Sequence, residues 1–530
     1  MAKDNRLALD LMSLAPLPHF VPKAGEEDIM TNPLYDALVL PHRGGEKTFL
    51  DLDGKGRISF GDFADLVARI ATVLVENGVK PGDRVAVQAP KTPETLAVYL
   101  ACQQAGAVFL PLNTAYTPSE VEFFLTDAAP RLFVCDEAAK EGYAGLAQKL
   151  GVGLLTIAAD RGGSLPAAAA KAQPMAEVVE RAPDDLAAIL YTSGTTGRSK
   201  GAMLSHDNLL SNTLALTDIW RFTGDDVLVH ALPIYHTHGL FVACNIMLRV
   251  GGTMIFHAAF NPDAVLDAIP RATALMGVPT FYTRLLASPR LTKEHVANMR
   301  LFISGSAPLL AETHVEFEER TGHRILERYG MTETSMTASN PYDGERRPGA
   351  VGFPLPGVSV RVASTEGKVL PQGEIGILEV KGPNVFKGYW NLPEKTAAEF
   401  RPGGWFITGD MSMIDADGYV HIVGRQKDLI IAGGLNIYPK EIEEVIDAIQ
   451  GVIETAVVGV PHPDMGEAAV AVIVAKPGLD LEAVKATVGE KLARFKHPRR
   501  YEIVAELPRN TMGKVQKSQL RESYKDSFTN

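Results

Sequence analysis

The sequence predicts an α/β protein, with a large N-terminal region of layered α/β subdomains on mostly parallel sheets and a small α+β domain after it. From residue 49, short apolar runs typical of buried strands alternate with segments of helical periodicity, which favours parallel sheets covered on both faces. The 530 residues are too many for one core and indicate at least one further domain. Near the C-terminus, two strand patterns flanked by helical patterns predict the small unit.

The expected elements of the large region follow one another along the chain. Ser59 and Asp62 resemble a capping box, and apolar side chains then repeat at helical spacing until Gly78. Thr92 and Pro93 open another helix as its N-cap and first residue. We expect strands at 84–88, 107–112, 186–190, 274–276 and 300–303, a helix at 117–127, and a surface excursion at 167–171.

Composition and charge exclude several classes of protein. A net charge of −11 argues against nucleic acid as the main partner. No apolar run approaches the ~20 residues needed to span a bilayer, so we expect no membrane partner and a cytoplasmic location. The cysteines Cys102, Cys135 and Cys244 are far apart in apolar surroundings, which favours buried thiols. Residues 1–30 contain acids that disfavour a targeting signal, and we expect an extension without a catalytic role.

The stretch 191–201 is the most informative part of the chain. It combines three glycines, five serine or threonine side chains and two cations, directly after the apolar run 186–190 and shortly before a helix start at Ser205. A strand that leads into a glycine-rich turn lets backbone N–H groups converge on an anion such as phosphate. The spacing is not that of a Walker loop. The alternative is a flexible surface loop.

This stretch resembles the phosphate loop of the adenylate-forming superfamily, which includes acyl-CoA synthetases, adenylation domains and luciferases. Three later stretches, 304–308, 327–334 and 405–410, strengthen the resemblance, which covers roughly residue 33 to the C-terminus. It implies ATP and Mg²⁺, with Tyr329 stacked on adenine, Thr332 on the α-phosphate, Glu333 holding the metal and Asp410 bound to ribose. The implied ATP-binding residues are Thr192, Ser193, Gly194, Thr195, Thr196, Gly197, Lys200, Ser306, Ala307, Glu327, Tyr329, Thr332, Asp410 and Arg425.

Two further motifs concern the acid substrate. His236 and His238 lie two residues apart, but no nearby cysteine or acidic cluster completes a metal set. In the resembled family His236 lies beside the acyl group, with Ser306 also at the substrate, although a packed structural histidine remains the alternative. Arg284 falls where many members that bind apolar acids carry an uncharged residue. A buried arginine needs a second anion, which favours a dicarboxylic acid, unless Arg284 lies on a solvent face.

The stretch 339–352, taken with the motif around Arg284, resembles the malonyl-CoA synthetases within that superfamily. The resemblance implies a ligase that converts malonate and ATP to malonyl-adenylate and then passes the malonyl group to coenzyme A. Three alternatives stay open. The acid could be methylmalonate, another short acid or an aryl acid; the acceptor could be a carrier protein; or the chain could bind nucleotide without catalysis.

The resemblance also divides the chain into an extension (1–30), a large adenylation domain (31–426) and a small mobile lid (427–530). Lys427 falls at the hinge position, and Gly433 and Gly434 would let coenzyme A pass close to the backbone. Basic residues between 494 and 500 suit its phosphates, or form a solvated face. Lys514 matches the catalytic lysine, with a surface lysine as the alternative. If exposed, it could also be a target for a lysine acyltransferase and a deacylase.

Overall fold

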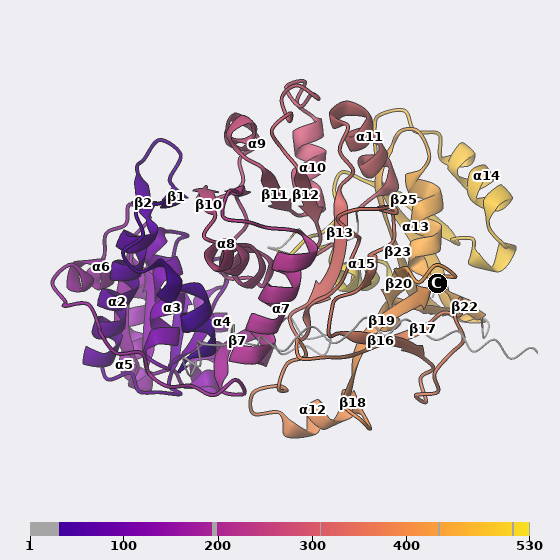
Figure 1. Ribbon diagram of the computed structural model, residues 1–530. Helices are drawn as coiled ribbons and strands as arrows, with labels where there is room; N and C mark the ends of the chain where they lie inside the picture. The colour runs from indigo at the N-terminus through magenta and orange to yellow at the C-terminus, as the bar shows by residue number, and fades with distance from the viewer. Residues whose placement is uncertain (1–30, 193–198, 308, 433–434, 511–512, 529–530) are drawn as a thin grey trace, which may run out of the picture.

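The protein is described by a computed structural model that covers residues 31–192, 199–307, 309–432, 435–510 and 513–528. Three sheets belong to the large region, and a fourth belongs to the C-terminal domain. The six-stranded sheet and its helices lie at one end of the molecule, and the C-terminal domain lies at the other end (Figure 1). The predicted α/β architecture with a small second domain is confirmed.

The first sheet has six strands in the order β6-β5-β3-β4-β7-β8. All pairs are parallel except β7 with β8, as the alternation of strands and helices predicts. Both faces carry a hydrophobic core. The strands are β3 (Arg84–Gln88), β4 (Val108–Pro111), β5 (Leu132–Asp136), β6 (Gly153–Ile157), β7 (Leu186–Thr192) and β8 (Lys200–Ser205), and the helices are α2 (Phe60–Glu76), α3 (Pro93–Gln104), α4 (Pro118–Ala128), α5 (Lys140–Leu150) and α6 (Ser164–Ala169), with η2 (Glu137–Ala139).

The second sheet has nine strands in the order β15-β14-β13-β12-β11-β9-β10-β1-β2. Its six central strands, from β13 to β1, are parallel, so their carboxyl ends share one edge. The strands are β1 (Thr48–Asp51), β2 (Arg57–Ser59), β9 (Val227–His230), β10 (Thr253–Phe256), β11 (Ala274–Gly277), β12 (Leu301–Ser304), β13 (Leu326–Met331), β14 (Ser335–Ser339) and β15 (Phe353–Pro354). The helices are α1 (Pro33–Leu38), η1 (Leu40–His42), α7 (His206–Ile219), η3 (His238–Cys244), α8 (Asn245–Val250), α9 (Pro262–Ala268), η4 (Ile269–Arg271), α10 (Pro279–Leu286) and α11 (Ala311–Thr321).

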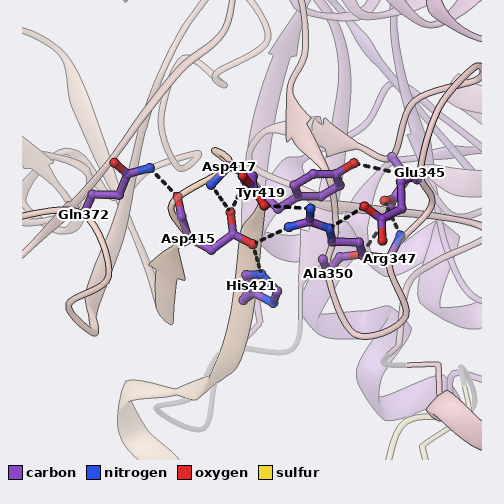
Figure 2. A network of polar contacts seen from close by, with 9 residues as sticks. Glu345, Arg347, Ala350, Gln372, Asp415, Asp417, Tyr419 and His421 are labelled. Atoms are coloured by element: carbon purple, nitrogen blue, oxygen red, sulfur yellow. Dashed lines mark hydrogen bonds and ion pairs between the residues drawn. The ribbon is translucent and has the colours of Figure 1, made fainter. Parts of the chain in front are cut away.

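The third sheet is antiparallel, and a charged network ties it to the second. Arg347, in the loop before β15, pairs with Asp415 at 3.0 Å and with Asp417 at 2.7 Å, and His421 also contacts Asp415 at 2.9 Å (Figure 2). This network anchors the stretch 339–352, which the sequence singled out, to the turn between β19 and β20. The elements are β16 (Ser359–Ala363), β17 (Gly376–Lys381), α12 (Pro393–Ala398), β18 (Phe400–Arg401), β19 (Trp405–Ile414) and β20 (Val420–Arg425).

The C-terminal domain is a mostly antiparallel sheet with a core on each face. Val457 faces one core and its neighbours Ala456 and Val458 face the other, as the period of two in a strand requires. The predicted boundary between 426 and 427 falls in η5, between the third sheet and this one. The elements are η5 (Gln426–Asp428), β21 (Ile430–Ala432), β22 (Leu435–Ile437), α13 (Pro439–Asp447), β23 (Val452–His462), β24 (Gly466–Ala475), α14 (Leu481–Lys491), η6 (Arg494–Lys496), β25 (Arg500–Val504) and α15 (Lys517–Tyr524).

One local expectation was confirmed but incomplete, and one was wrong. Ser205 caps α7, as predicted, but the strand β8 before it, which pairs antiparallel with β7, was not predicted. The surface excursion at 167–171 overlaps α6, whose Leu165 and Ala169 are buried against the core. The three cysteines are buried free thiols, as predicted. No helix in the described part of the chain has the length and apolar character needed to cross a membrane.

Candidate active site

The candidate site lies at the carboxyl edge of the nine-stranded sheet, where the segments after β9, β11 and β12 meet. A cavity of about 160 Å³ lies there. The segment after β9 contributes His236 and His238, the start of α10 contributes Thr280, and the loop after β12 contributes Ser306. Gly513 of the C-terminal domain also lines the cavity. Ligands of open α/β sheets bind at this edge, because the loops that follow the strands converge there.

The two histidines line the cavity, but the backbone that carries them does not have the extended conformation that the sequence suggested. They do not lie on an extended segment, since His236 is in a turn and His238 begins the π-helix η3. Burial, with the positive charges of Lys514 and Arg328, lowers the pKa of His236 to about 3. Burial and Arg328 also hold the pKa of His238 well below its usual value. Both rings are therefore neutral near pH 7, and neither can neutralise an anion.

Ser306 connects the cavity to the strand behind it. Its hydroxyl oxygen lies 3.4 Å from Nδ1 of His238 and accepts a hydrogen bond from Nη2 of Arg328, also at 3.4 Å. Its φ of 70° is in the left-handed region, which costs a non-glycine residue of the order of 1–3 kcal/mol. Such conformations cluster at binding sites. The place of Ser306 beside substrate remains a prediction.

The predicted ribose and adenine residues are brought together beside β13. The hydroxyl of Tyr329 donates to Oδ2 of Asp410 at 2.5 Å, and Nε of Arg425 contacts Oδ1 at 2.7 Å. The Asp410 backbone N–H donates to Thr408 at 3.0 Å. Burial raises the pKa of Asp410 above its usual value, although Arg425 opposes this shift. Each Asp410 oxygen thus has its own partner, which fixes the carboxylate in place.

Glu333 lies in a second cluster, with residues that the sequence did not single out. The hydroxyl of Tyr389 lies 3.0 Å from Glu333 and 2.6 Å from Glu399, and Lys200 pairs with Glu399 at 3.2 Å. A phenol has one proton, so it cannot serve both carboxylates at once. Burial raises the pKa of Glu333. Among the described residues, no lysine or arginine pairs with Glu333, and this leaves its charge available for a cation.

Lys514 belongs to the C-terminal domain and lies near the cluster around Asp410 and Glu333. Its backbone N–H donates to the Asn510 side chain at 2.9 Å, and the turn is closed by the bridge between Arg509 and Val515. Lys514 has an exposed surface on its turn, although the protein atoms around its amine desolvate that group. This desolvation and the positive charge of Arg425 lower its pKa, and Asp410 opposes the shift. The structure therefore brings Lys514 next to the cluster around Asp410, as the sequence predicts for a catalytic lysine.

Comparison with known proteins assigns the family. The model of the AMP-binding enzyme family matches residues 40–390, and that of the AMP-binding enzyme C-terminal domain matches residues 441–514. The chain belongs to the AMP-binding enzymes. The resemblance to the adenylate-forming superfamily is confirmed.

Three relatives place the chain within the family. ATP-bound MatB from Rhodopseudomonas palustris is 58% identical, covers 94% of this chain and 100% of its own, and superimposes with a TM-score of 0.92. The apo form of that protein, with the same identity and coverage, gives 0.82. Malonate–CoA ligase of Arabidopsis thaliana is 33% identical over 90% of this chain and 86% of its own. Feruloyl-CoA synthase of an Amycolatopsis species is 37% identical over 89% and 95%.

The remaining predicted residues lie at different distances from the cavity. Arg284 is exposed on α10, one helical turn from Thr280 of the cavity wall. Glu327 is buried and points at His314, which it approaches to 3.7 Å. Lys427 is exposed in η5. Thr192, Ala307 and Thr332 are half-buried, whereas Ser193, Gly194, Thr195, Thr196, Gly197, Gly433 and Gly434 lie outside the described residues.

Sequence reasoning missed three residues of the site: Arg328, Tyr389 and Glu399. Arg328 is part of the 327–334 motif. Arginine is rarely buried in a strand, so its presence next to apolar residues could have marked it as a site residue. Tyr389 and Glu399 had no such signal. They meet Glu333 and Lys200 across 56 and 199 residues of sequence, respectively, and only the fold reveals such contacts.

Proposed function

We propose that this AMP-binding enzyme is a malonate–CoA ligase. It forms malonyl-adenylate from malonate and ATP with release of pyrophosphate, and coenzyme A then displaces AMP to give malonyl-CoA. The observation that carries this proposal is the small cavity between His236, Ser306 and the Lys514 turn, beside the cluster around Asp410. In this position an acid is next to both the predicted catalytic lysine and the predicted nucleotide residues.

The size of the cavity favours a short acid. Its volume of about 160 Å³ lies below the range of about 300–1,000 Å³ typical of drug-sized ligands. Both the Arabidopsis malonate–CoA ligase and feruloyl-CoA synthase resemble this chain over most of its length. A feruloyl group is much bulkier than malonate, so cavity volume supports the first of these two activities.

In the first half-reaction, a carboxylate oxygen of malonate attacks the α-phosphorus of ATP, and the bond to pyrophosphate breaks. Lys514 lies where it can meet the malonate carboxylate and the α-phosphate as negative charge accumulates. Asp410, fixed by Tyr329 and Arg425, orients the ribose. No protein nucleophile is required, because malonate supplies the attacking oxygen and coenzyme A supplies the thiol. Catalysis then consists of positioning and charge neutralisation.

The residues present fit a magnesium ion bound through one carboxylate. Glu333 is a buried carboxylate without a cationic partner in the described part of the chain, and Mg²⁺ typically binds one or two carboxylates together with phosphate oxygens. None of the described residues form a group of three or more metal-binding side chains. Glu333 would therefore hold the ion jointly with ATP. When bound, the ion neutralises charge on the phosphates of the leaving group.

For the second half-reaction, the surface of the C-terminal domain offers cations for the phosphates of coenzyme A. Arg494 and Arg499 are exposed and pair with no carboxylate among the described residues. Lys496 and Arg500, by contrast, are paired with Glu441 and Glu502. Arg494 and Arg499 are the better candidates, and this favours free coenzyme A over a carrier protein as acceptor.

The test is a panel of acids assayed with the purified chain for AMP and thioester formation. The acids are malonate, methylmalonate, acetate, propionate and benzoate, each with ATP, Mg²⁺ and coenzyme A. We expect malonyl-CoA as the main product. Preference for another acid would refute the assignment of malonate as the substrate. Adenylate formation without transfer to coenzyme A would favour a carrier-loading enzyme, and pyrophosphate release with no acid dependence would refute ligation.

A further inference from the structure

Arg328 is a buried cation that has no anionic partner among the described residues. It lies in β13 with 4% of its surface exposed. The only hydrogen bond of its side chain among the described residues is the 3.4 Å contact from Nη2 to Ser306, and its Nε has no partner among them. No described carboxylate lies within ion-pair distance of it. The guanidinium also packs so closely on Gly305 that a Cβ at that position would collide with it. This close packing holds the charge in one place.

An unpaired buried charge is unfavourable for the fold. Burial lowers the pKa of Arg328 to about 9, so the group remains mostly cationic at neutral pH and bears the desolvation cost. His236 and His238 are neutral neighbours and cannot offset it. Arg300, which is 25% exposed and therefore less buried than Arg328, is paired: it contacts Asp226 at 2.7 Å. Arg328 therefore differs from a structural arginine and lacks only an anion.

We infer that Arg328 determines specificity for the acid: its guanidinium, together with Ser306, receives the second carboxylate of a short dicarboxylic acid. This inference rests on the proposed function and extends it to a residue of the acid site. Ser306 and His238 both line the cavity, and Arg328 lies directly behind them. An anion in the cavity is thus within reach of the guanidinium, after a small shift of Ser306.

The second carboxylate suits Arg328 better than the nucleotide does. Side chains alternate across a strand, so Arg328 and Tyr329 point to opposite faces of β13. Tyr329 faces Asp410 and the predicted ribose position, whereas Arg328 faces Ser306 on the acid side. The carboxylate that reacts is served by Lys514. Arg284 is exposed, one helical turn from the cavity wall, and would approach the same anion from the solvent side.

The inference predicts an unusual combination of effects for Arg328→Met, which keeps the approximate volume and removes the charge. The ratio of kcat/KM for malonate to that for propionate should fall about 10- to 100-fold, because a charge-assisted contact is lost for malonate alone. The unliganded variant should melt a few degrees higher than the wild type, because an unpaired buried charge has been removed. Arg328→Lys keeps the charge but loses the planar guanidinium. Its malonate-to-propionate ratio of kcat/KM should lie between those of the wild type and Arg328→Met.

The matched control is Arg324→Met, four residues earlier and exposed, where Arg324 pairs with Glu318 at 2.7 Å. Its ratio should equal that of the wild type. Wild-type enzyme without preference for malonate would refute the proposed function. Wild-type preference that survives in Arg328→Met would refute only the inference. Equal loss for both acids, or a variant that is destabilised or fails to fold, also contradicts it, since Arg328 would then serve the nucleotide or the fold.

Discussion

On the nucleotide side of the cleft, Asp410 is held by Tyr329 and Arg425, and both carboxylate oxygens have partners before any ligand binds. On the acid side, the described polar groups are largely unpaired: Arg328 has one weak hydrogen bond, Nδ1 of His236 has none, and Nε2 of His238 has none. Tyr329 of the nucleotide side and Arg328 of the acid side are neighbours in the strand β13 and point to its opposite faces.

This difference indicates how the two substrates are recognised. A preorganised nucleotide side needs little rearrangement to bind ribose. Because it does not contact the acid, it contributes equally to the activity with every acid. An acid side with unpaired donors gains most from the ligand that completes its hydrogen bonds, so it discriminates between acids. Substitutions on the nucleotide side should therefore change activity with all acids equally. Substitutions on the acid side should change the ratio between acids.

Lys514 lies between the two sides, and its loss should have the largest effect. Lys514→Ala removes the charge that meets the developing anion, and we expect malonyl-adenylate formation to fall roughly 10²–10³-fold or more. Thioester formation from supplied malonyl-adenylate should largely survive, because that step does not build charge on the α-phosphate in the same way. The two half-reactions are measured separately by pyrophosphate release and by malonyl-CoA formation. An equal loss of both would contradict this role.

Modification of Lys514 should have the same effect as the alanine substitution. Lys514 has an exposed surface on a turn of the C-terminal domain, so a lysine acyltransferase could reach it, and acylation would remove its charge. We expect acylated protein to lose adenylation and to recover it after treatment with a deacylase. Mass spectrometry of Lys514, paired with activity at each step, checks this. Full activity at high occupancy of the modification would rule out such a switch.

On the nucleotide side, Asp410→Asn keeps the size of the side chain and removes its charge. The pair with Arg425 is lost, and the hydrogen bond from Tyr329 is weakened. Hydrogen bonds to charged groups contribute about 1.5–3 kcal/mol, so kcat/KM for ATP should fall roughly 10- to 100-fold. The ratio of malonate to propionate should not change. A change in that ratio would show that the two sides do not act separately.

On the acid side, Arg284→Ala tests the arginine that the sequence predicted. If Arg284 approaches the second carboxylate of malonate, kcat/KM for malonate should fall about 10- to 100-fold, with little effect on propionate. Arg284→Lys should rescue only part of the loss. The control is Arg290→Ala, since Arg290 is an exposed arginine paired with Asp267 outside the cavity. An unchanged preference for malonate in Arg284→Ala would leave Arg284 as a surface charge.

The smallest expected effect is a change in stability with pH, and it comes from Asp447 of the C-terminal domain. Burial and the neighbouring carboxylates Glu443, Glu454 and Glu312 raise the pKa of Asp447 from 3.8 to about 7, and Glu312 belongs to the large region. The folded state therefore binds this proton more tightly, so its stabilisation is present below about pH 4 and is lost as pH rises to 7. Asp447→Asn should melt like the wild type near pH 3.5 and should be more stable by about 1–2 kcal/mol at pH 8. Thermal melts across this range measure the difference, and a constant difference would contradict it.

Local patterns were sufficient to predict most elements of the fold. The strand at 84–88 and the Thr92 cap follow from short-range apolar spacing and from the preference for proline after an N-cap. The strand β8 was missed because Lys200 and Ser205 read as loop and helix cap, while its partner strand β7 lies before the glycine-rich stretch. α6 was missed because its alanines carry no strong periodicity.

The pairing of charges could not be predicted from sequence. Tyr329 and Asp410 were both named from motifs, but their contact spans 81 residues. Whether Arg328 forms an ion pair depends on every element packed around it. The residues next to it in the sequence do not predict this. Sequence motifs therefore identified residues on both sides of the cleft, whereas only the structure shows which side is already paired.

The most direct test of this account is the preference of the wild-type chain between malonate and propionate, two acids that differ chiefly in the second carboxylate. Initial rates of AMP formation with ATP, Mg²⁺ and coenzyme A give kcat/KM for each acid. Because no carboxylate among the described residues pairs with Arg328, we expect kcat/KM for malonate to exceed that for propionate by at least about 10- to 100-fold. Equal values, or a preference for propionate, would contradict the claim that the acid side is built for a dicarboxylate.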